Sequence, residues 1–164
     1  MALGVAETVA ADVKARLAAW PAPLHLVEGE RDKRDAFKAA SVALACSGTV
    51  STELAAAGCP VVVAYRLDPL SHQLVKRIAT TRLFTLFNIA AGEAVAPELI
   101  QGQCSAPKLA AALAPLLDDP ALRAQQVRRQ HAALERMGRV QGDPSARAAR
   151  AVLEVLQRAA PRAA

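Results

Sequence analysis

A polar turn, Ser47-Gly48-Thr49, follows an apolar run that ends at Ala45 and precedes a stretch with helical spacing. Gly48 permits the backbone to approach a ligand closely. A helix that begins at Thr49 or Val50 would aim its unpaired N–H groups and the positive end of its dipole at this turn. Because such a helix start can bind phosphate, this segment is a candidate site for a diphosphate.

A carboxylate follows one helical turn later. Glu53 shares a helix face with Thr49 through i, i+4 spacing. Its carboxylate could accept two hydrogen bonds from the cis-diol of a ribose, so diphosphate on the helix start and ribose on Glu53 would form a nucleotide site. The pattern is equally compatible with a capping box, in which a Ser or Thr N-cap pairs with a Glu about three residues later.

Short apolar runs predict the strands that must position this turn. The run PVVVAY at residues 60–65 is unbroken and β-branched, as expected of a parallel strand covered on both faces. Residues 41–45 predict a second buried strand that ends directly before the turn. Residues 24–27 and 84–87 predict two more short strands.

Helical spacing and an alanine content of about a quarter predict helices between and after the strands. The last helix should turn Val152, Val155 and Leu156 inward. The helix before it is polar and rich in arginine. The expected helices cover residues 5–19, 31–40, 49–57, 71–79, 89–101, 106–117, 121–137 and 145–159.

Alternating strands and helices imply an α/β fold with a Rossmann-like parallel sheet, right-handed crossovers, helices on both faces and C-terminal helices. Only three or four strands are predicted, whereas a nucleotide-binding sheet of this class normally has about five or six. The chain also starts in a helical pattern with no strand before it. We therefore expect an incomplete sheet. Residues 1–118 would form a partial Rossmann-like nucleotide-binding domain, for which the resemblance described below implies a nucleotide sugar, and residues 119–164 would form C-terminal Arg-rich helices.

The basic charge of the chain lies at its C-terminal end. The formal net charge is +5, but residues 1–119 contain 11 basic and 12 acidic residues, whereas residues 120–164 contain nine Arg, no Lys and three acids. A basic helical tail can meet phosphates, anionic lipid or an acidic partner surface. A solvated face with an arginine bias is the plain alternative.

Other classes of site and location are disfavoured. No apolar run is long enough to span a membrane, and no secretory signal is visible. Three widely separated cysteines fit reduced thiols in a cytoplasmic protein. The three histidines share no metal-site spacing, so we expect neither a metal nor another cofactor.

The predicted helix at residues 71–79 combines an apolar side with Lys76 and Arg77, and Arg82 follows it. An apolar side with a basic rim suits the surface of an anionic bilayer. An amphipathic helix that faces the protein core is the alternative interpretation.

The pattern S-G-T-x-S-T-E-L-x-x-x-G-x-P-x-V-V, which begins at Ser47, is similar to the donor-site motif of GT-B glycosyltransferases. Further stretches resemble one family of that class, the lipid-A-disaccharide synthases. They are residues 45–66 around the motif, 76–77, 86–92 (LFNIAAG) and 97–101 (PELIQ). Together they cover roughly residues 24–117.

The resemblance implies a reaction and a cellular location. Members join a UDP-linked 2,3-diacylglucosamine to 2,3-diacylglucosamine 1-phosphate, form a β-1,6 disaccharide with inversion, release UDP and require no metal. They are peripheral enzymes on the cytoplasmic face of the Gram-negative inner membrane, and their last helices help dimerisation. The implied partners are UDP-diacylglucosamine, a lipid acceptor, the inner-membrane surface and a second copy of the chain, with no nucleic acid.

The resemblance also implies residue roles in the donor site. Ser47, Gly48 and Thr49 should hold the diphosphate, with Ser51 in the same motif, and Glu53 should bind the ribose.

Two residues outside the motif complete the implied site. Asn88 matches a family position at the start of a helix that faces the donor, although an N-cap is the plain alternative. Arg66 lies just past a strand end, where its guanidinium could reach a phosphate. A surface salt bridge is equally compatible with Arg66.

No catalytic residue can be assigned. The general base of the family is a carboxylate in the N-terminal half, and this chain has no counterpart of that half. An inverting transfer needs such a base, so we expect a UDP-binding chain that is inactive alone. The alternatives are a fragment of another GT-B glycosyltransferase or UDP-sugar epimerase, and a non-enzymatic helical module that binds an acidic partner through its tail.

Overall fold

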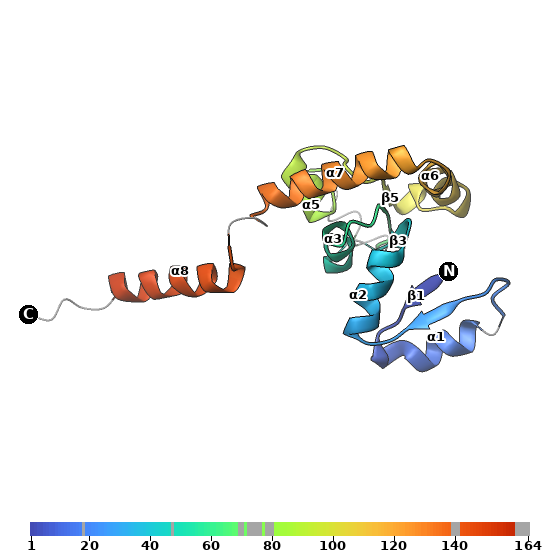
Figure 1. The fold of residues 1–164 in the computed structure, drawn as a ribbon, viewed down its shortest axis with the longest axis horizontal. Helices are drawn as coiled ribbons and strands as arrows, with labels where there is room; N and C mark the ends of the chain where they lie inside the picture. Colours follow the sequence, from blue (N-terminus) through green and yellow to red (C-terminus); the bar gives the residue numbers. More distant parts are fainter. Residues whose placement is uncertain are drawn as a thin grey trace, which may run out of the picture.

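The computed structural model shows helices around two small parallel sheets, followed by C-terminal helices (Figure 1). This arrangement confirms the expected α/β class and is consistent with part of a Rossmann-like GT-B half. The structure describes residues 1–17, 19–46, 48–68, 71, 77, 81–138 and 142–159.

The larger sheet has the order β3-β4-β5, with all strands parallel. Its central strand β4 (Val61–Tyr65) is the predicted PVVVAY strand, and its first three valines are fully buried. The edge strand β3 (Ala43–Ala45) is predicted correctly in place but not in burial, since Leu44 is 51% exposed. Within the described part of the chain, β3 pairs only with β4, so its outer side lacks a neighbouring strand.

The smaller sheet pairs β1 (Ala2–Gly4) with β2 (His25–Val27). The 3₁₀ helix η1 (Glu7–Val9) and α1 (Ala10–Leu17) connect the two strands. The prediction that no strand precedes the first helix is therefore wrong. β1 is only three residues long and is recognised as a strand because its main chain pairs with β2. Three residues are too few to show a strand pattern in the sequence.

Two predicted helices lie next to the sheets. The helix α2 (Glu30–Ala39) follows β2, and its Phe37 packs against the core. The helix α3 (Thr49–Ala56) follows β3 and contributes Leu54 and Ala55 to the core. The core consists of Leu54, Ala55, Cys59, Val61, Val63, Phe87, Val95, Ala96, Ala133 and Leu134.

The segment from Phe84 to Gln101 differs from both predictions made for it. The expected strand at residues 84–87 is replaced by the start of α5 (Leu86–Ala91). The expected helix at 89–101 ends early, because Gly92 adopts a left-handed conformation with φ 74°. The chain then forms β5 (Glu98–Ile100) and the 3₁₀ helix η2 (Gln101–Gln103).

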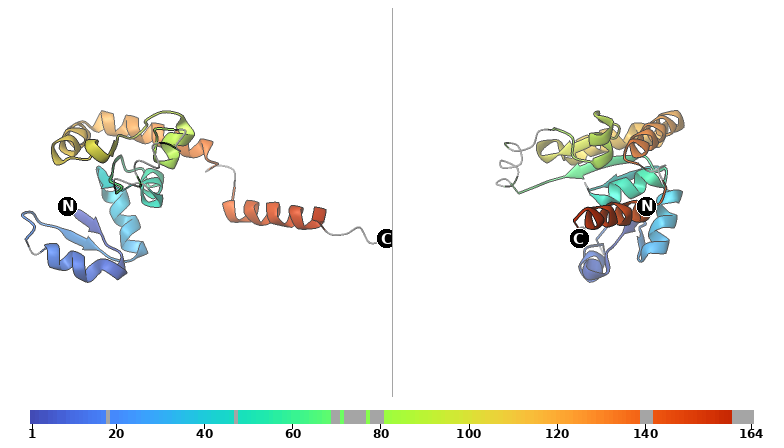
Figure 2. Two further views of the ribbon diagram at one scale, coloured as in Figure 1. Left: turned by 180° about the vertical axis from the view of Figure 1, so that it is seen from behind. Right: turned by 90° about the vertical axis from the view of Figure 1, so that its left-hand side faces the viewer.

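The C-terminal part begins with α6 (Ala106–Asp118) and α7 (Pro120–Arg136), both close to their predicted bounds. The helix α7 runs beside α5 and α6 (Figures 1 and 2). It is not only a polar surface helix, since Ala133 and Leu134 join the core. The division at residues 118 and 119 remains a prediction, although α7 packs on the same core as α3 and α5.

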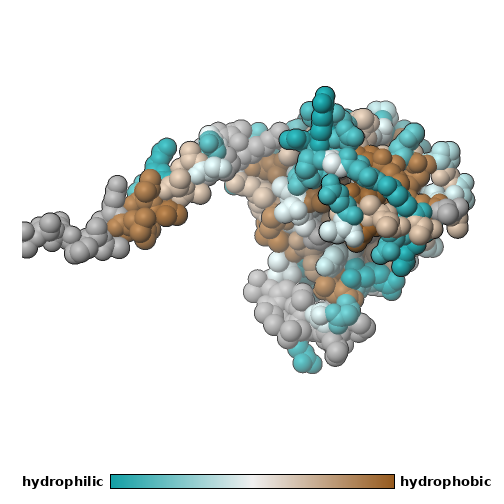
Figure 3. Space-filling model, turned by 90° about the horizontal axis from the view of Figure 1, so that it is seen from below, coloured by the Kyte–Doolittle hydropathy of each residue, from teal (hydrophilic) through white to brown (hydrophobic). Residues whose placement is uncertain are grey.

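The last helix, α8 (Pro144–Ala159), stands apart from the other elements (Figures 1 and 2). The prediction that Val152, Val155 and Leu156 point inward is wrong, because these side chains are between 59 and 65% exposed. They form an apolar patch on α8 (Figure 3). An amphipathic pattern predicts that a helix has an apolar face, but not which element covers it.

Some predictions fall on residues outside the described part of the chain. The helix at 71–79 and its membrane hypothesis belong here, since only Ser71 and Arg77 of that segment are described. Ser47 also lies outside the described residues. Among the helices that are described, none has the length and apolar character needed to cross a membrane.

Candidate functional site

The start of α3 is open to solvent. Gly48 is the N-cap, with φ 141°, and no side chain caps the first turn. The capping-box alternative is therefore wrong, because the N-cap is a glycine rather than a Ser or Thr. Gly48, Thr49 and Val50 are all exposed, and a Cβ built on Gly48 would meet no atom within 4 Å. The turn thus leaves space for a group that accepts hydrogen bonds from the helix start.

Ser51 supports this turn from inside the protein. Its hydroxyl donates a 2.7 Å hydrogen bond to the carbonyl oxygen of Gly48, and its side chain is fully buried. The structure therefore assigns Ser51 a contact within the chain that fixes the conformation of the turn.

Glu53 lies on the outer face of α3, one turn after Thr49. Its side chain is 45% exposed, and its Oε2 lies 3.1 Å from the Nζ of Lys33 on α2. Lys33 also contacts Glu30, with 2.8 Å between its Nζ and the Oε1 of Glu30. The Glu53 carboxylate is therefore held at the surface, where a ligand can reach it.

Arg66 follows the last residue of β4, and Gly48 follows β3. Because β3 and β4 are adjacent parallel strands, both residues lie at the carboxyl edge of the sheet, where ligands of open α/β sheets bind. Arg66 is exposed, and no ion pair of Arg66 is seen within the described ranges. The salt-bridge alternative for Arg66 thus receives no support there.

Gln101 fixes the backbone next to Arg66. Its Oε1 accepts from the N–H of Leu67 at 2.9 Å, and its Nε2 donates to the carbonyl of Leu67 at 3.1 Å. Gln101 itself has φ 52°, in the left-handed region that is unfavourable for a side chain of this type. Sequence reasoning missed this role, because the two residues are 34 positions apart.

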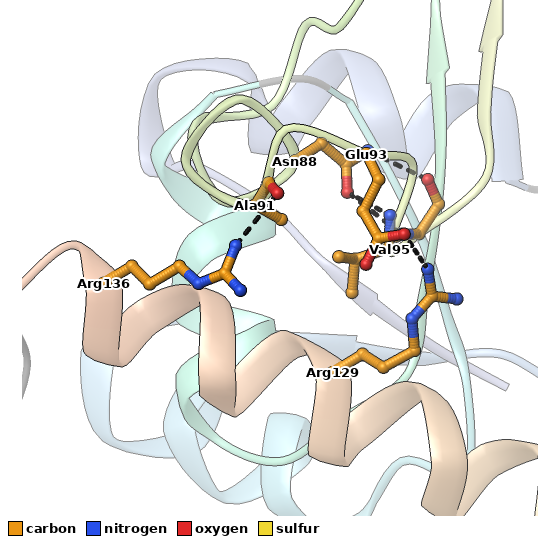
Figure 4. Close-up of polar contacts among 7 residues, drawn as sticks. Asn88, Ala91, Glu93, Val95, Arg129 and Arg136 are labelled. Carbon is orange, nitrogen blue, oxygen red and sulfur yellow. Dashed lines mark hydrogen bonds and ion pairs between the residues drawn. The ribbon is translucent and has the colours of Figure 1, made fainter.

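Asn88 is fully buried and uses all of its hydrogen-bonding capacity within the protein. Its Oδ1 accepts from the N–H of Val95 (Figure 4) and from the N–H of Ala96. Its Nδ2 donates to the carbonyl of Ala96 and to Oε1 of Glu98. The N-cap alternative is wrong, since Thr85 occupies that position of α5. Asn88 is instead a bridge between α5 and the entry to β5.

Asn88 lies beside the start of β5, whereas Gly48 and Arg66 come after the ends of their strands. Its partners Ala96 and Glu98 precede or begin β5, whereas Gly48 and Arg66 follow the ends of β3 and β4. Asn88 is therefore near the amino end of β5.

Glu98 is a second residue whose role sequence reasoning missed. Its carboxylate accepts hydrogen bonds from the N–H of Phe84, from the N–H and hydroxyl of Thr85 and from Asn88, at 2.7–2.9 Å. These bonds fix the two residues that directly precede α5, where the N-cap Thr85 makes no side-chain cap bond. The sequence signal for this role was an acid directly after Pro97. It could not identify the partners of Glu98, which lie 13 and 14 positions earlier in the chain.

The helix α7 holds the loop after α5 in place (Figure 4). Arg136 donates from Nη1 to the carbonyl of Ala91 at 3.0 Å, which satisfies the C-terminal end of α5. Arg129 forms an ion pair of 3.1 Å with Glu93. Two arginines of the basic C-terminal part thus serve contacts within the domain.

Residues 5–152 match the model of a protein family described as lipid-A-disaccharide synthetase. The match covers most of the 164 residues. The chain belongs to this family. The lipid-A-disaccharide synthetase family consists of glycosyltransferases. This membership agrees with the glycosyltransferase motif at the start of α3.

Curated relatives carry the name lipid-A-disaccharide synthase. One from Rhodospirillum centenum is 43% identical over 153 residues, which cover 93% of this chain and 37% of the relative. One from Rhodopseudomonas palustris strain BisB18 is 47% identical, with 87% of this chain and 36% of the relative covered. One from Paramagnetospirillum magneticum is 42% identical, with 92% and 39% covered. The chain thus spans little more than a third of the length of these relatives.

Burial raises the pKa of Cys59 to about 11, which makes this thiol a poor nucleophile. Cys46, next to the α3 turn, is exposed, and the three cysteines are free thiols. Within the described residues, no group of three or more His, Cys, Asp or Glu side chains could hold a metal ion.

Proposed function

We propose that this chain forms the donor-binding part of a lipid-A-disaccharide synthase. That enzyme would transfer 2,3-diacylglucosamine from UDP to 2,3-diacylglucosamine 1-phosphate in a β-1,6 linkage, with inversion. The observation that carries the proposal is the exposed, glycine-capped start of α3, with the surface carboxylate of Glu53 one turn along.

The diphosphate of the donor binds at the turn before α3. The N–H groups of the first turn donate to its oxygens, and the helix dipole favours its negative charge. Gly48 leaves room for a phosphate oxygen close to the backbone. The motif assigns Ser47 and Thr49 to this diphosphate, and Ser51 keeps the turn in shape through its bond to Gly48.

The uridine ribose binds to Glu53, whose carboxylate accepts from the two hydroxyls. Arg66, at the end of the neighbouring strand, places a positive charge at the same edge and pairs with a phosphate oxygen. Asn88 acts indirectly, because its hydrogen bonds hold α5 against β5 rather than facing this edge.

Transfer itself requires a base that deprotonates the acceptor hydroxyl. We assign that base and the acceptor cleft to a part of the enzyme beyond this chain. The chain alone therefore binds UDP without transferring the sugar. Peripheral association with the cytoplasmic face of the inner membrane and assembly with a second copy are properties of the proposed whole enzyme.

Isothermal titration with UDP tests the donor site. The Glu53→Ala variant should bind UDP at least about tenfold more weakly, because a hydrogen bond to a charged acceptor is lost. Glu28→Ala is the matched control, since Glu28 is also a half-exposed acid paired with a lysine, at 2.7 Å from Lys14. Unchanged affinity of Glu53→Ala would contradict the ribose contact, and indifference of the unaltered chain to UDP would favour a non-enzymatic interaction module.

An assay of disaccharide formation tests the second part of the proposal. The chain is incubated with UDP-2,3-diacylglucosamine and 2,3-diacylglucosamine 1-phosphate, and no disaccharide is expected. Product formed by the chain alone would show that the base lies within these 164 residues.

A further inference from the structure

Lys33 links two carboxylates that belong to different helices. Its Nζ lies 2.8 Å from Oε1 of Glu30, in the first turn of α2, and 3.1 Å from Oε2 of Glu53 on α3. The Lys33 side chain is only 23% exposed, whereas Glu30 and Glu53 are 76% and 45% exposed. The ammonium group is thus the more enclosed member of the cluster and connects the outer faces of α2 and α3.

This link restricts the Glu53 side chain without occupying all of its carboxylate. The contact with Lys33 involves Oε2, and no contact of Oε1 with another described residue is seen. A glutamate on an exposed helix face otherwise samples several rotamers, and fixing one of them on binding costs conformational entropy. The contact with Lys33 restricts these rotamers before the ligand binds, so less entropy is lost on binding. Such preorganisation improves affinity.

A cis-diol makes a specific demand on such a carboxylate. Its two hydroxyls donate together only if the plane of the carboxylate has a fixed orientation. A carboxylate that rotates freely would gain little from the second hydroxyl. The orientation held by Lys33 therefore bears on whether the site distinguishes a ribose from a 2′-deoxyribose.

We propose that Lys33 is a positioning residue of the donor site, which orients the Glu53 carboxylate so that the site selects ribonucleotides over 2′-deoxyribonucleotides. The inference rests on the donor site proposed above. Lys33 acts through Glu53 and need not touch the ligand. Hydrogen bonds to Glu30 and to Glu53 raise the pKa of Lys33, so the ammonium form persists throughout the neutral range.

A purely structural role for Lys33 predicts a different outcome. An exposed ion pair between two helices contributes little to stability. If Lys33 served only as such a brace, its loss would change the affinities for a ribonucleotide and a 2′-deoxyribonucleotide equally. The ratio of the two affinities is therefore the quantity that separates the two roles.

The experiment measures dissociation constants of UDP and 2′-deoxyuridine 5′-diphosphate by isothermal titration. In the Lys33→Met variant, the preference for UDP should fall about fivefold, with most of the loss in the affinity for UDP. Lys33→Arg should retain most of the preference, because its guanidinium can still pair with Glu53. Lys14→Met is the matched control and should behave as the unaltered chain, since Lys14 of α1 forms a similar ion pair with Glu28, between β2 and α2.

The outcomes separate this inference from the proposed function. An unchanged preference in Lys33→Met, or an equal loss for both ligands, would overturn the role of Lys33. The donor site would still stand if Glu53→Ala weakened UDP binding in the same experiment. If neither ligand bound the unaltered chain, the donor site itself would be contradicted. Lys33→Gln provides a second neutral variant, and the thermal midpoint of each variant confirms that it is folded.

Discussion

Gln126 of α7 donates a hydrogen bond from its Nε2 to the main-chain carbonyl of Val61, 2.8 Å away and 65 positions earlier in the chain. The sheet register explains why this bond is needed. Val61 pairs with Ala43 of β3 on one side, but β5 begins its pairing only at Val63. Gln126 therefore completes the hydrogen bonding of β4 where β5 does not reach. Gln130 adds a weaker bond of 3.3 Å to the carbonyl of Cys59.

The Gln126→Leu variant should lower the free energy of unfolding by about 1–3 kcal/mol, because the buried carbonyl of Val61 loses its partner. Urea unfolding followed by circular dichroism measures the change. Gln125→Leu is the control, since Gln125 is exposed on the same helix and its replacement should stay within about 0.5 kcal/mol. Equal effects of the two variants would contradict the role of Gln126.

The Asn88→Ala variant should cost about 2–4 kcal/mol of stability, because it leaves N–H and C=O groups of the loop before β5 unpaired. The same urea experiment applies. Leu86→Ala, at an exposed position of α5, should cost much less. If UDP affinity changed while stability did not, Asn88 would be a direct ligand contact and the bridging role would be wrong.

The Gly48→Ala variant tests the backbone of the α3 turn. A Cβ would meet no neighbouring atom there, so the cost arises from the φ of 141° alone and should be about 1 kcal/mol or more. UDP affinity should fall as well, since relief of the strain moves the turn. Gly102→Ala is the control, because Gly102 also has open space but no positive φ. A stable Gly48→Ala variant with unchanged UDP affinity would count against the turn as the diphosphate site.

Thiol labelling should distinguish the cysteines. At pH 8, Cys46 should react rapidly with a thiol reagent and Cys59 should not, because Cys59 is buried and its pKa is raised to about 11. A Cys46→Ser variant assigns the fast phase, and denaturant should make Cys59 reactive. Rapid labelling of Cys59 in the folded chain would contradict its burial.

The same thiol makes stability depend on pH. The pKa of Cys59 is higher in the folded state than in the unfolded state. Its contribution is therefore complete below the pKa of the unfolded thiol and is lost as the pH rises toward about 11. The free energy of unfolding at alkaline pH should fall less in Cys59→Ala than in the unaltered chain.

The exposed face of α8 should add little to the stability of the core. Joint replacement of Val155 and Leu156 by serine should change the free energy of unfolding of the core by less than about 0.5 kcal/mol. Leu134→Ala, in the core contributed by α7, should cost about 2–5 kcal/mol. Comparable losses in both variants would mean that the α8 face is packed.

Local sequence determined the elements that build the candidate site. The unbroken valines of β4, the glycine turn at Gly48 and the helix that follows could be predicted, because strand and helix propensity and glycine conformation depend on neighbouring residues. The same stretch carried the resemblance to the family. The bounds of α6 and α7 also agree closely with those predicted from helical spacing.

Only the tertiary structure decided how distant residues meet. The predictions for residues 84–87 and 98–100 failed for reasons of this kind. The Glu98 carboxylate binds the N–H groups before α5, and residues 98–100 pair with β4 as a strand. The burial of Gln126 and the exposure of the α8 face likewise depend on which partner is within reach. Hydrogen-bond pairing and burial are properties of two surfaces in contact, and a local pattern specifies only one of them.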